Sequence, residues 1–249
     1  TRAARIGRHS GEEQILIAML VRISIESLVL KTLQHAMLQP RFDLSGVKPM
    51  RAVLAELGDL PDVSDALRGE VCINYNTFGQ LDFGPPSPGV GQASVPEWLL
   101  SPPGVPKGVA KRAYQAQVLK RWNDLYDAMG PPPVAPEAAS AAVLKALTQL
   151  SKSFHQTDIV LRILFPVYEQ AGDSVLTLSA RRRVTAAGLT LVESRLRTGR
   201  WPDTLSEAEP DPFDGKPLRY VPGERLYSIG KDRIDGGGTK GDEVLEFAT

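Results

Sequence analysis

The residues best suited to chemistry lie near the end of the chain, in a loop from Ser228 to Asp242. This loop carries three aspartates, Asp232, Asp235 and Asp242, and three consecutive glycines at 236–238. A calcium ion takes about six to eight oxygen ligands from carboxylates and carbonyls on a flexible backbone. The aspartates supply carboxylates and the glycines leave carbonyls accessible. The loop is therefore a candidate calcium site with these three aspartates as ligands.

Two basic residues in the same loop favour a different interpretation. Lys231 and Arg233 flank Asp232 directly, and their charges would repel a bound cation. A loop whose aspartates pair with these two side chains would need no metal. At the level of sequence the calcium loop and the metal-free, ion-paired loop both stay open.

No other sequence motif indicates reactive residues, although a Ser-His-Asp triad stays open because its members meet only in the folded chain. His9, His35 and His155 share no metal-ligand spacing. No G-x-S-x-G motif indicates a nucleophile, and no G-K-[S/T] motif indicates a phosphate-binding loop. The single cysteine, Cys72, excludes an intrachain disulfide and is expected to be a small buried hydrophobe. We therefore name no catalytic residue and favour a non-enzymatic protein.

Two further charged groups are expected to be structural. Asp211 and Asp214 lie in a turn segment, where an aspartate accepts hydrogen bonds from its own backbone. The run from Arg181 to Arg183 is expected to form a solvated helix face whose aliphatic stems cover apolar neighbours.

Composition places the chain among globular proteins. Its 249 residues suffice for one large or two small domains, and 42% are hydrophobic. The 29 basic and 29 acidic side chains cancel, which argues against a nucleic-acid binder. The most apolar stretch, residues 15–38, contains Arg22, Glu26 and Lys31, so we expect no membrane span. An anchor upstream of Thr1 stays open.

Apolar periodicity predicts a mainly helical chain. The expected helices cover residues 12–39, 49–57, 61–71, 109–129, 137–151 and 158–198. A capping box at Ser10 and Glu13 would start the first helix, and Pro40 would end it. Pro166 is expected to kink or split the last helix, because proline removes a backbone bond there.

The last fifty residues have a different character. Two short β segments, 217–221 and 225–229, flank Pro222-Gly223 and predict a hairpin, and residues 244–247 would add a third strand. Residues 79–108, with seven prolines and six glycines, are expected to form a long loop. The expected fold is a multi-helix body at 1–184 and a tail at 185–249 with a small antiparallel hairpin or sheet.

The tail also carries a family resemblance. The segments GRWPDTL (199–205), DPFDGKPLRY (211–220) and LYSIG (226–230) precede the acidic loop. In this order they resemble the C-terminal part of the major pseudopilins of bacterial type II secretion systems. In that family a helix is followed by a G-x-x-P-x-x-L turn, a D-P-W-G-x-P turn, a hairpin and an S-x-G-x-D loop that binds calcium.

The resemblance covers residues 185–249, about a quarter of the chain. It implies that Asp232 is the loop aspartate and Asp242 the acidic residue before the last strand, although Arg233 stands where the family has glycine. Residues 1–180 have no counterpart in a pseudopilin, and the hydrophobic N-terminal methylation segment is missing. The whole chain looks like uncharacterised bacterial envelope proteins in which a helical body is fused to such a tail.

Three functions remain open. The first is a non-enzymatic structural or interaction protein of the bacterial envelope, extracytoplasmic or membrane-tethered and related to secretion, with Ca²⁺ as its only expected cofactor. The second is an enzyme with an unrecognised cleft beside residues 79–108. The third is a helical module that binds a peptide or protein. The sequence identifies neither the protein partner nor the oligomeric state.

Overall fold

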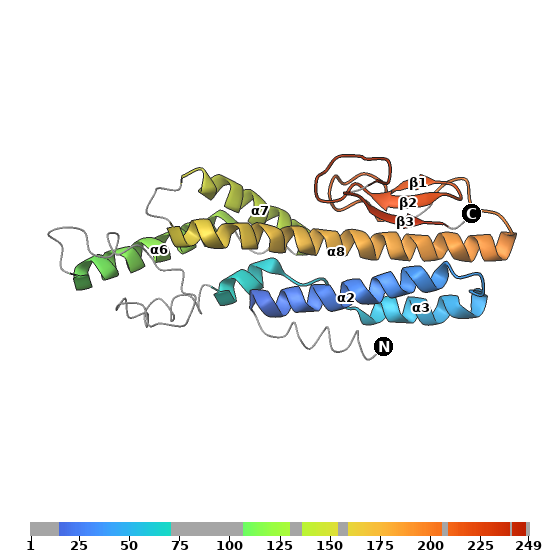
Figure 1. Cartoon of the computed structure of the whole chain (residues 1–249), viewed down its shortest axis with the longest axis horizontal. Helices are drawn as coiled ribbons and strands as arrows, with labels where there is room; N and C mark the ends of the chain where they lie inside the picture. Colours follow the sequence, from blue (N-terminus) through green and yellow to red (C-terminus); the bar gives the residue numbers. More distant parts are fainter. Residues whose placement is uncertain are drawn as a thin grey trace, which may run out of the picture. The chain divides into compact units, whose positions relative to one another are not determined.

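The computed structural model describes residues 15–70, 107–129, 136–153, 159–205, 209–239 and 241–247. These residues form a mainly helical chain that ends in a small three-stranded antiparallel sheet (Figure 1). The predicted fold class is therefore confirmed. None of the described helices combines the length and the apolarity needed to span a membrane.

The helices follow the predicted order. They are α2 (Leu16–Met37), α3 (Leu44–Glu56), α6 (Lys107–Met129), α7 (Pro136–Ser151) and α8 (Ile159–Thr198), with a further helical stretch at 63–70. α2 ends before Pro40, as predicted. α8 ends at Thr198, and the following Gly199 has a φ of 77°, which suits a residue without a Cβ, and an N–H that donates to the carbonyl of Arg195.

Two helix predictions differ from the structure. α3 begins at Leu44 rather than at Pro49, because the Asp43 side chain accepts a hydrogen bond from the Ser45 N–H at 2.9 Å and caps the helix five residues earlier than expected. α8 continues through Pro166 as one helix. Proline lacks the N–H for one backbone hydrogen bond, and the remaining backbone hydrogen bonds of this 40-residue helix keep it continuous.

Several predictions lie outside the described residues. They concern the capping box at Ser10 and Glu13, Cys72, His9, His155 and the loop at 79–106. Residues 107 and 108, which were assigned to that loop, belong to α6.

Contacts within the chain divide it into two compact units. The terminal unit comprises Thr1–Glu13, Ile17–Asp62 and Asp173–Thr249, and the central unit comprises Gln14–Leu16 and Val63–Gly172. In this division α2 and α3 belong with the C-terminal sheet. The domain boundary after residue 184, which came from the sequence, stays a prediction.

The sheet has the strand order β1-β2-β3, formed by β1 (Arg219–Val221), β2 (Arg225–Ser228) and β3 (Glu243–Glu246). The predicted turn is present, with the Glu224 N–H donating to the Val221 carbonyl at 3.0 Å and Gly223 at a φ of 77°. The ladder then pairs Val221 with Arg225, so the hairpin loop contains the three residues 222–224.

In the terminal unit the end of α8 lies between the sheet on one side and α2 and α3 on the other (Figure 1). Buried apolar side chains from all of these elements form one cluster: Met37, Val47, Val184, Ala187, Leu189, Leu191, Val192, Leu218, Leu226, Leu245 and Phe247. Trp201 stacks on Phe247 with ring centroids 4.3 Å apart and closes the cluster beside the helix end. The sheet is therefore fixed to α8 by apolar packing.

Three consecutive arginines of α8 connect this helix to its surroundings. Each pairs with a carboxylate from a different segment: Arg181 with Glu243 at 2.8 Å, Arg182 with Glu26, and Arg183 with Glu209 at 3.0 Å. Their side chains are between 14% and 17% exposed. The predicted solvated face is therefore wrong. Successive helix residues point about 100° apart, so neighbours in sequence reach different elements.

Candidate functional site: the C-terminal module and its acidic loop

The C-terminal module, meaning the described residues between 209 and 247, begins with a tight turn. The Asp211 N–H donates to the Lys216 carbonyl at 2.7 Å, and the Gly215 N–H donates to the Asp211 carbonyl at 2.8 Å. The side chain of Asp211 accepts from the Phe213 N–H, and that of Asp214 accepts from the Lys216 N–H, each at 3.0 Å. The prediction that both aspartates bond their own backbone is confirmed.

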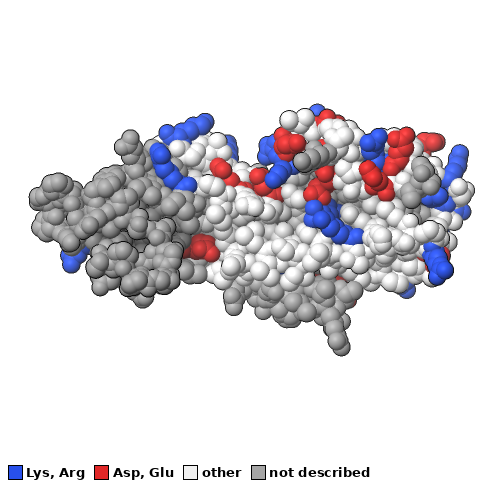
Figure 2. Space-filling view, viewed as in Figure 1, with Lys and Arg blue, Asp and Glu red and all other residues white. Residues whose placement is uncertain are grey.

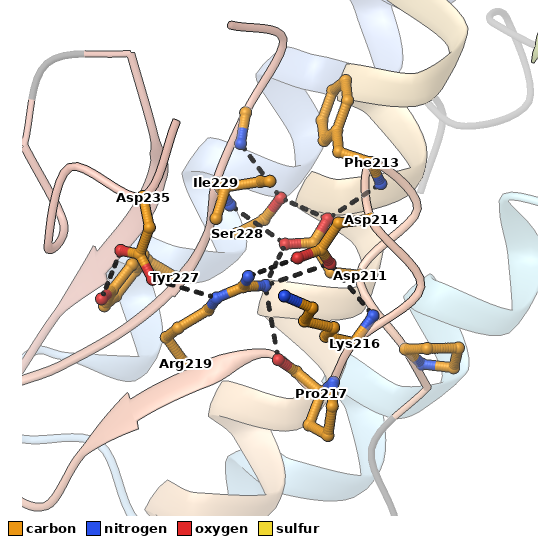
Figure 3. A network of polar contacts seen from close by, with 12 residues as sticks. Asp211, Phe213, Asp214, Lys216, Pro217, Arg219, Tyr227, Ser228, Ile229 and Asp235 are labelled. Atoms are coloured by element: carbon orange, nitrogen blue, oxygen red, sulfur yellow. Dashed lines mark hydrogen bonds and ion pairs between the residues drawn. The ribbon is translucent and has the colours of Figure 1, made fainter. Parts of the chain in front are cut away.

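Asp211 also makes contacts far along the chain (Figure 3). Its carboxylate accepts from the Ser228 hydroxyl at 2.9 Å, from the Ile229 N–H at 3.0 Å and from Arg219 Nη1 at 3.0 Å. The residue is fully buried. A buried carboxylate is tolerated when hydrogen bonds and a countercharge satisfy it, and here both are present. Asp211 thus joins the turn to the end of β2.

Arg219, the first residue of β1, lies at the centre of a larger cluster (Figure 3). Besides Asp211, it pairs through Nη2 with Asp214 Oδ2 at 2.5 Å and through Nε with Asp235 Oδ2 at 3.4 Å. The hydrogen bond from Arg219 lowers the pKa of the Asp214 carboxyl, and the same bond raises the pKa of Arg219. We call Asp211, Asp214, Arg219, Ser228 and Asp235 the Asp211 network.

Asp235 links this network to the acidic loop, residues 230–242. Its Oδ1 accepts from the Tyr227 hydroxyl at 3.0 Å and from the Gly237 N–H at 3.1 Å. The Gly237 bond and then the Tyr227 bond lower the pKa of the Asp235 carboxyl. Burial, followed by the bond to Asp235, raises the pKa of Tyr227. One predicted calcium ligand is thus engaged by an arginine, a phenol and an amide.

The other two predicted ligands bond to loop amides. Asp232 Oδ1 accepts from the Ile234 N–H at 3.1 Å. Asp242 Oδ2 accepts from the N–H groups of Gly238 at 2.8 Å and Thr239 at 2.9 Å. These bonds hold the loop backbone in its turns.

At each end of the loop a glycine lies so close to neighbouring atoms that no Cβ would fit. Gly230, with a φ of 69°, lies so close to the Gly241 carbonyl that an added Cβ would overlap it. At Gly241, with a φ of 115°, an added Cβ would come within 2.6 Å of Asp232 Oδ2. The two ends of the loop therefore touch, and Asp232 faces the backbone next to Asp242.

The charges of the two basic residues of the loop act on Asp173 of α8. Burial raises the pKa of Asp173 on α8, and the charges of Lys231 and Arg233 partly oppose that rise. The contacts described for the loop aspartates go to amides, to Tyr227 and to Arg219, rather than to Lys231 or Arg233. The surface of the module carries both signs of charge intermixed (Figure 2).

Within the described residues, no three side chains of His, Cys, Asp or Glu are grouped closely enough to hold a metal ion. Asp232 and Asp242 use one carboxylate oxygen each in the bonds above. Asp235, in contrast, already pairs with an arginine. Calcium at this loop stays a prediction.

Sequence reasoning missed Arg219, Tyr227 and Ser228 as members of one cluster. Arg219 faces Tyr227 because the hairpin loop has three residues. A two-residue Pro-Gly loop would shift the pairing by one position and turn the side chains to opposite faces. Knowing that the hairpin loop has three residues would therefore have been enough to predict that Arg219 and Tyr227 lie side by side.

Comparison with known proteins adds no relative: no protein-family model, no curated protein and no solved structure matches this chain.

Proposed function

We propose that this protein is a non-enzymatic structural or interaction protein of the bacterial envelope, with the C-terminal module as a rigid unit that presents the acidic loop. The proposal rests on the observation that carboxylates of this module form hydrogen bonds and ion pairs with other groups of the same module. Asp211, Asp214 and Asp235 bond to amides, hydroxyls and a guanidinium of the module itself. Carboxylates that are bonded within the module in this way stabilise its fold.

The location in the envelope and the link to secretion rest on the resemblance of residues 185–249 to pseudopilin tails. The order of the elements supports that resemblance. A helix ending at a glycine, a D-P-x-x-G turn, a hairpin, a Gly-rich loop and a last strand follow one another. The protein is accordingly expected outside the cytoplasm or tethered to a membrane, and it acts through a protein partner.

Calcium binding by the acidic loop is the testable part of this proposal. Thermal unfolding of the full chain would be followed in EGTA and then in millimolar Ca²⁺. A ligand that binds the native state stabilises it by about 2.7 kcal/mol at a concentration 100 times its dissociation constant. That corresponds to a rise of roughly 5 to 10 °C in the midpoint for a chain of this size.

The variant Asp232→Ala should abolish the rise. Asp203→Ala, at an exposed aspartate outside the loop, is the matched control and should preserve it. An unchanged midpoint in wild type would remove calcium from the proposal. A hydrolase or transferase activity that scales with protein concentration and disappears in a single point variant would contradict the non-enzymatic function itself.

A further inference from the structure

The guanidinium of Arg219 occupies a position where three carboxylates converge. Nη1 contacts Asp211 at 3.0 Å and Asp214 Oδ1 at 3.3 Å, Nη2 contacts Asp214 Oδ2 at 2.5 Å, and Nε contacts Asp235 at 3.4 Å (Figure 3). The arginine side chain is 18% exposed, and Asp211 is fully buried. The positive charge therefore lies inside the cluster.

Each of the three carboxylates is held in place by further hydrogen bonds, although Asp235 is half exposed while Asp211 is buried. Asp211 is held by the N–H groups of Phe213 and Ile229, and Asp214 is held by the N–H of Lys216. Asp235 is held by Tyr227 and Gly237. Hydrogen bonds within the module thus hold three carboxylates around one guanidinium, and like charges that share a site raise the energy of the fold unless a cation lies between them.

Arginine suits this position better than lysine. Its planar group presents five N–H donors in a fixed fork, whereas an ammonium is a compact point charge. The fork also spans segments distant in sequence, because Asp211 and Asp214 belong to the turn before β1 and Asp235 to the acidic loop. The hydrogen bond from Arg219 to Asp214 lowers the pKa of that carboxyl, as expected for a carboxylate next to a cation.

We propose that Arg219 is the structural cation of the C-terminal module: its guanidinium neutralises and cross-links Asp211, Asp214 and Asp235, so that the module folds without a metal ion. In metal-stabilised loops an ion gathers the carboxylates. Here the chain supplies the charge itself. This role is independent of the envelope function and of any calcium bound by Asp232 and Asp242.

A double-mutant cycle in EGTA tests the proposal. In the wild-type background Asp214→Asn should lower the unfolding midpoint, because it removes an ion pair and keeps the acceptor for the Lys216 N–H. In the Arg219→Gln background the same change should raise the midpoint, because it relieves repulsion between carboxylates without a countercharge. If the effect of Asp214→Asn on the midpoint changes sign when Arg219 is replaced, Arg219 acts through its positive charge and not through packing alone.

Two further variants define the effect. Arg219→Gln alone should lower the midpoint by roughly 5 °C or more, and Arg219→Lys should restore part of that loss. Arg225→Gln is the control on the neighbouring strand, where Arg225 pairs with the exposed Glu224 at 3.4 Å and donates to the Gly237 carbonyl at 3.0 Å but contacts no carboxylate of the Asp211 network. In that background Asp214→Asn should still be destabilising.

Hydrogen exchange of the Ile229 amide, which donates to Asp211, reports on the network itself. It can be measured even in variants that are only partly folded. Arg219→Gln should accelerate it at least tenfold, and adding Asp214→Asn should slow it again. The proposal is overturned if Asp214→Asn lowers stability equally with and without Arg219. It is also overturned if Arg219→Gln leaves both the midpoint and the Ile229 exchange rate unchanged.

Discussion

The Asp211 network and the acidic loop are adjacent and contain the same kinds of residues, yet they use aspartate differently. Asp211 is fully buried and accepts hydrogen bonds from two amides, a hydroxyl and an arginine. Asp232 is exposed and accepts one bond from an amide two residues on. The network therefore contains the buried, internally bonded aspartate, and the loop contains the exposed one.

The largest expected effect is at Asp211. Asp211→Ala leaves two amides, the Ser228 hydroxyl and Arg219 without their buried acceptor, and removing one partner of a buried ion pair costs about 3 to 5 kcal/mol. Urea unfolding followed by circular dichroism would measure it. Asp232→Ala in EGTA is the control, with an expected loss below about 1 kcal/mol. Equal losses of unfolding free energy in the two variants would contradict the claim that the network stabilises the fold more than the loop does.

Gly230 lies at the junction of the two regions and is expected to be the next most sensitive position. In Gly230→Ala the new methyl group overlaps the Gly241 carbonyl, and φ is positive, so the cost is roughly 2 to 4 kcal/mol. Gly237→Ala has a similar φ of 71° and no atom within 4 Å of the added Cβ, so its cost is about 1 to 2 kcal/mol. Thermal unfolding of both variants checks the difference, and a larger loss at Gly237 would contradict it.

Acid should remove the stability that the ionised carboxylates of the network provide. The folded pKa values of Asp214 and Asp235 lie below their ordinary value of 3.8. A lowered folded pKa gives stability that is present above the unfolded value and is lost as pH falls through 3.8 toward the folded value. The unfolding midpoint should therefore be level above about pH 5 and fall below about pH 4. In Arg219→Gln this fall should be shallower, and an unchanged profile would count against the role of Arg219.

The smallest effect is expected at Asp173, where the sign is opposite. Burial raises its pKa, so its ionisation costs stability as pH rises through 3.8 toward the folded value. Asp173→Asn should therefore stabilise the protein at pH 7 by a few tenths of a kcal/mol and leave it unchanged at pH 3. A destabilised variant at pH 7 would show that Lys231 and Arg233 outweigh burial.

The parts of the structure that depend on local pattern could be predicted from the sequence. The spacing of apolar residues gave α2, α6, α7 and α8, and Pro222-Gly223 gave the hairpin turn. The bonds from Asp211 to Phe213 and from Asp214 to Lys216 span two residues and were expected as well.

The parts that depend on long-range contacts could not be predicted. Asp211 meets Ile229 across 18 residues, and Arg182 meets Glu26 across 156. Glu26 is fully buried between Arg22 and Arg182, although its sequence context shows only a charge in an apolar helix. Such pairs depend on the packing of helices and on strand register, which one-dimensional spacing does not contain.

Amide hydrogen exchange of the full wild-type chain in EGTA shows whether the Asp211 network holds the C-terminal module together. We expect the amides bonded to Asp211, those of Phe213 and Ile229, to be among the slowest in the module with or without Ca²⁺. The amides of Ile234 and Thr239, which are bonded to Asp232 and Asp242 of the acidic loop, should exchange faster in EGTA. Exchange of the Ile229 amide as fast as that of the loop amides, or slow exchange there that requires Ca²⁺, would contradict a module held together by its own charges.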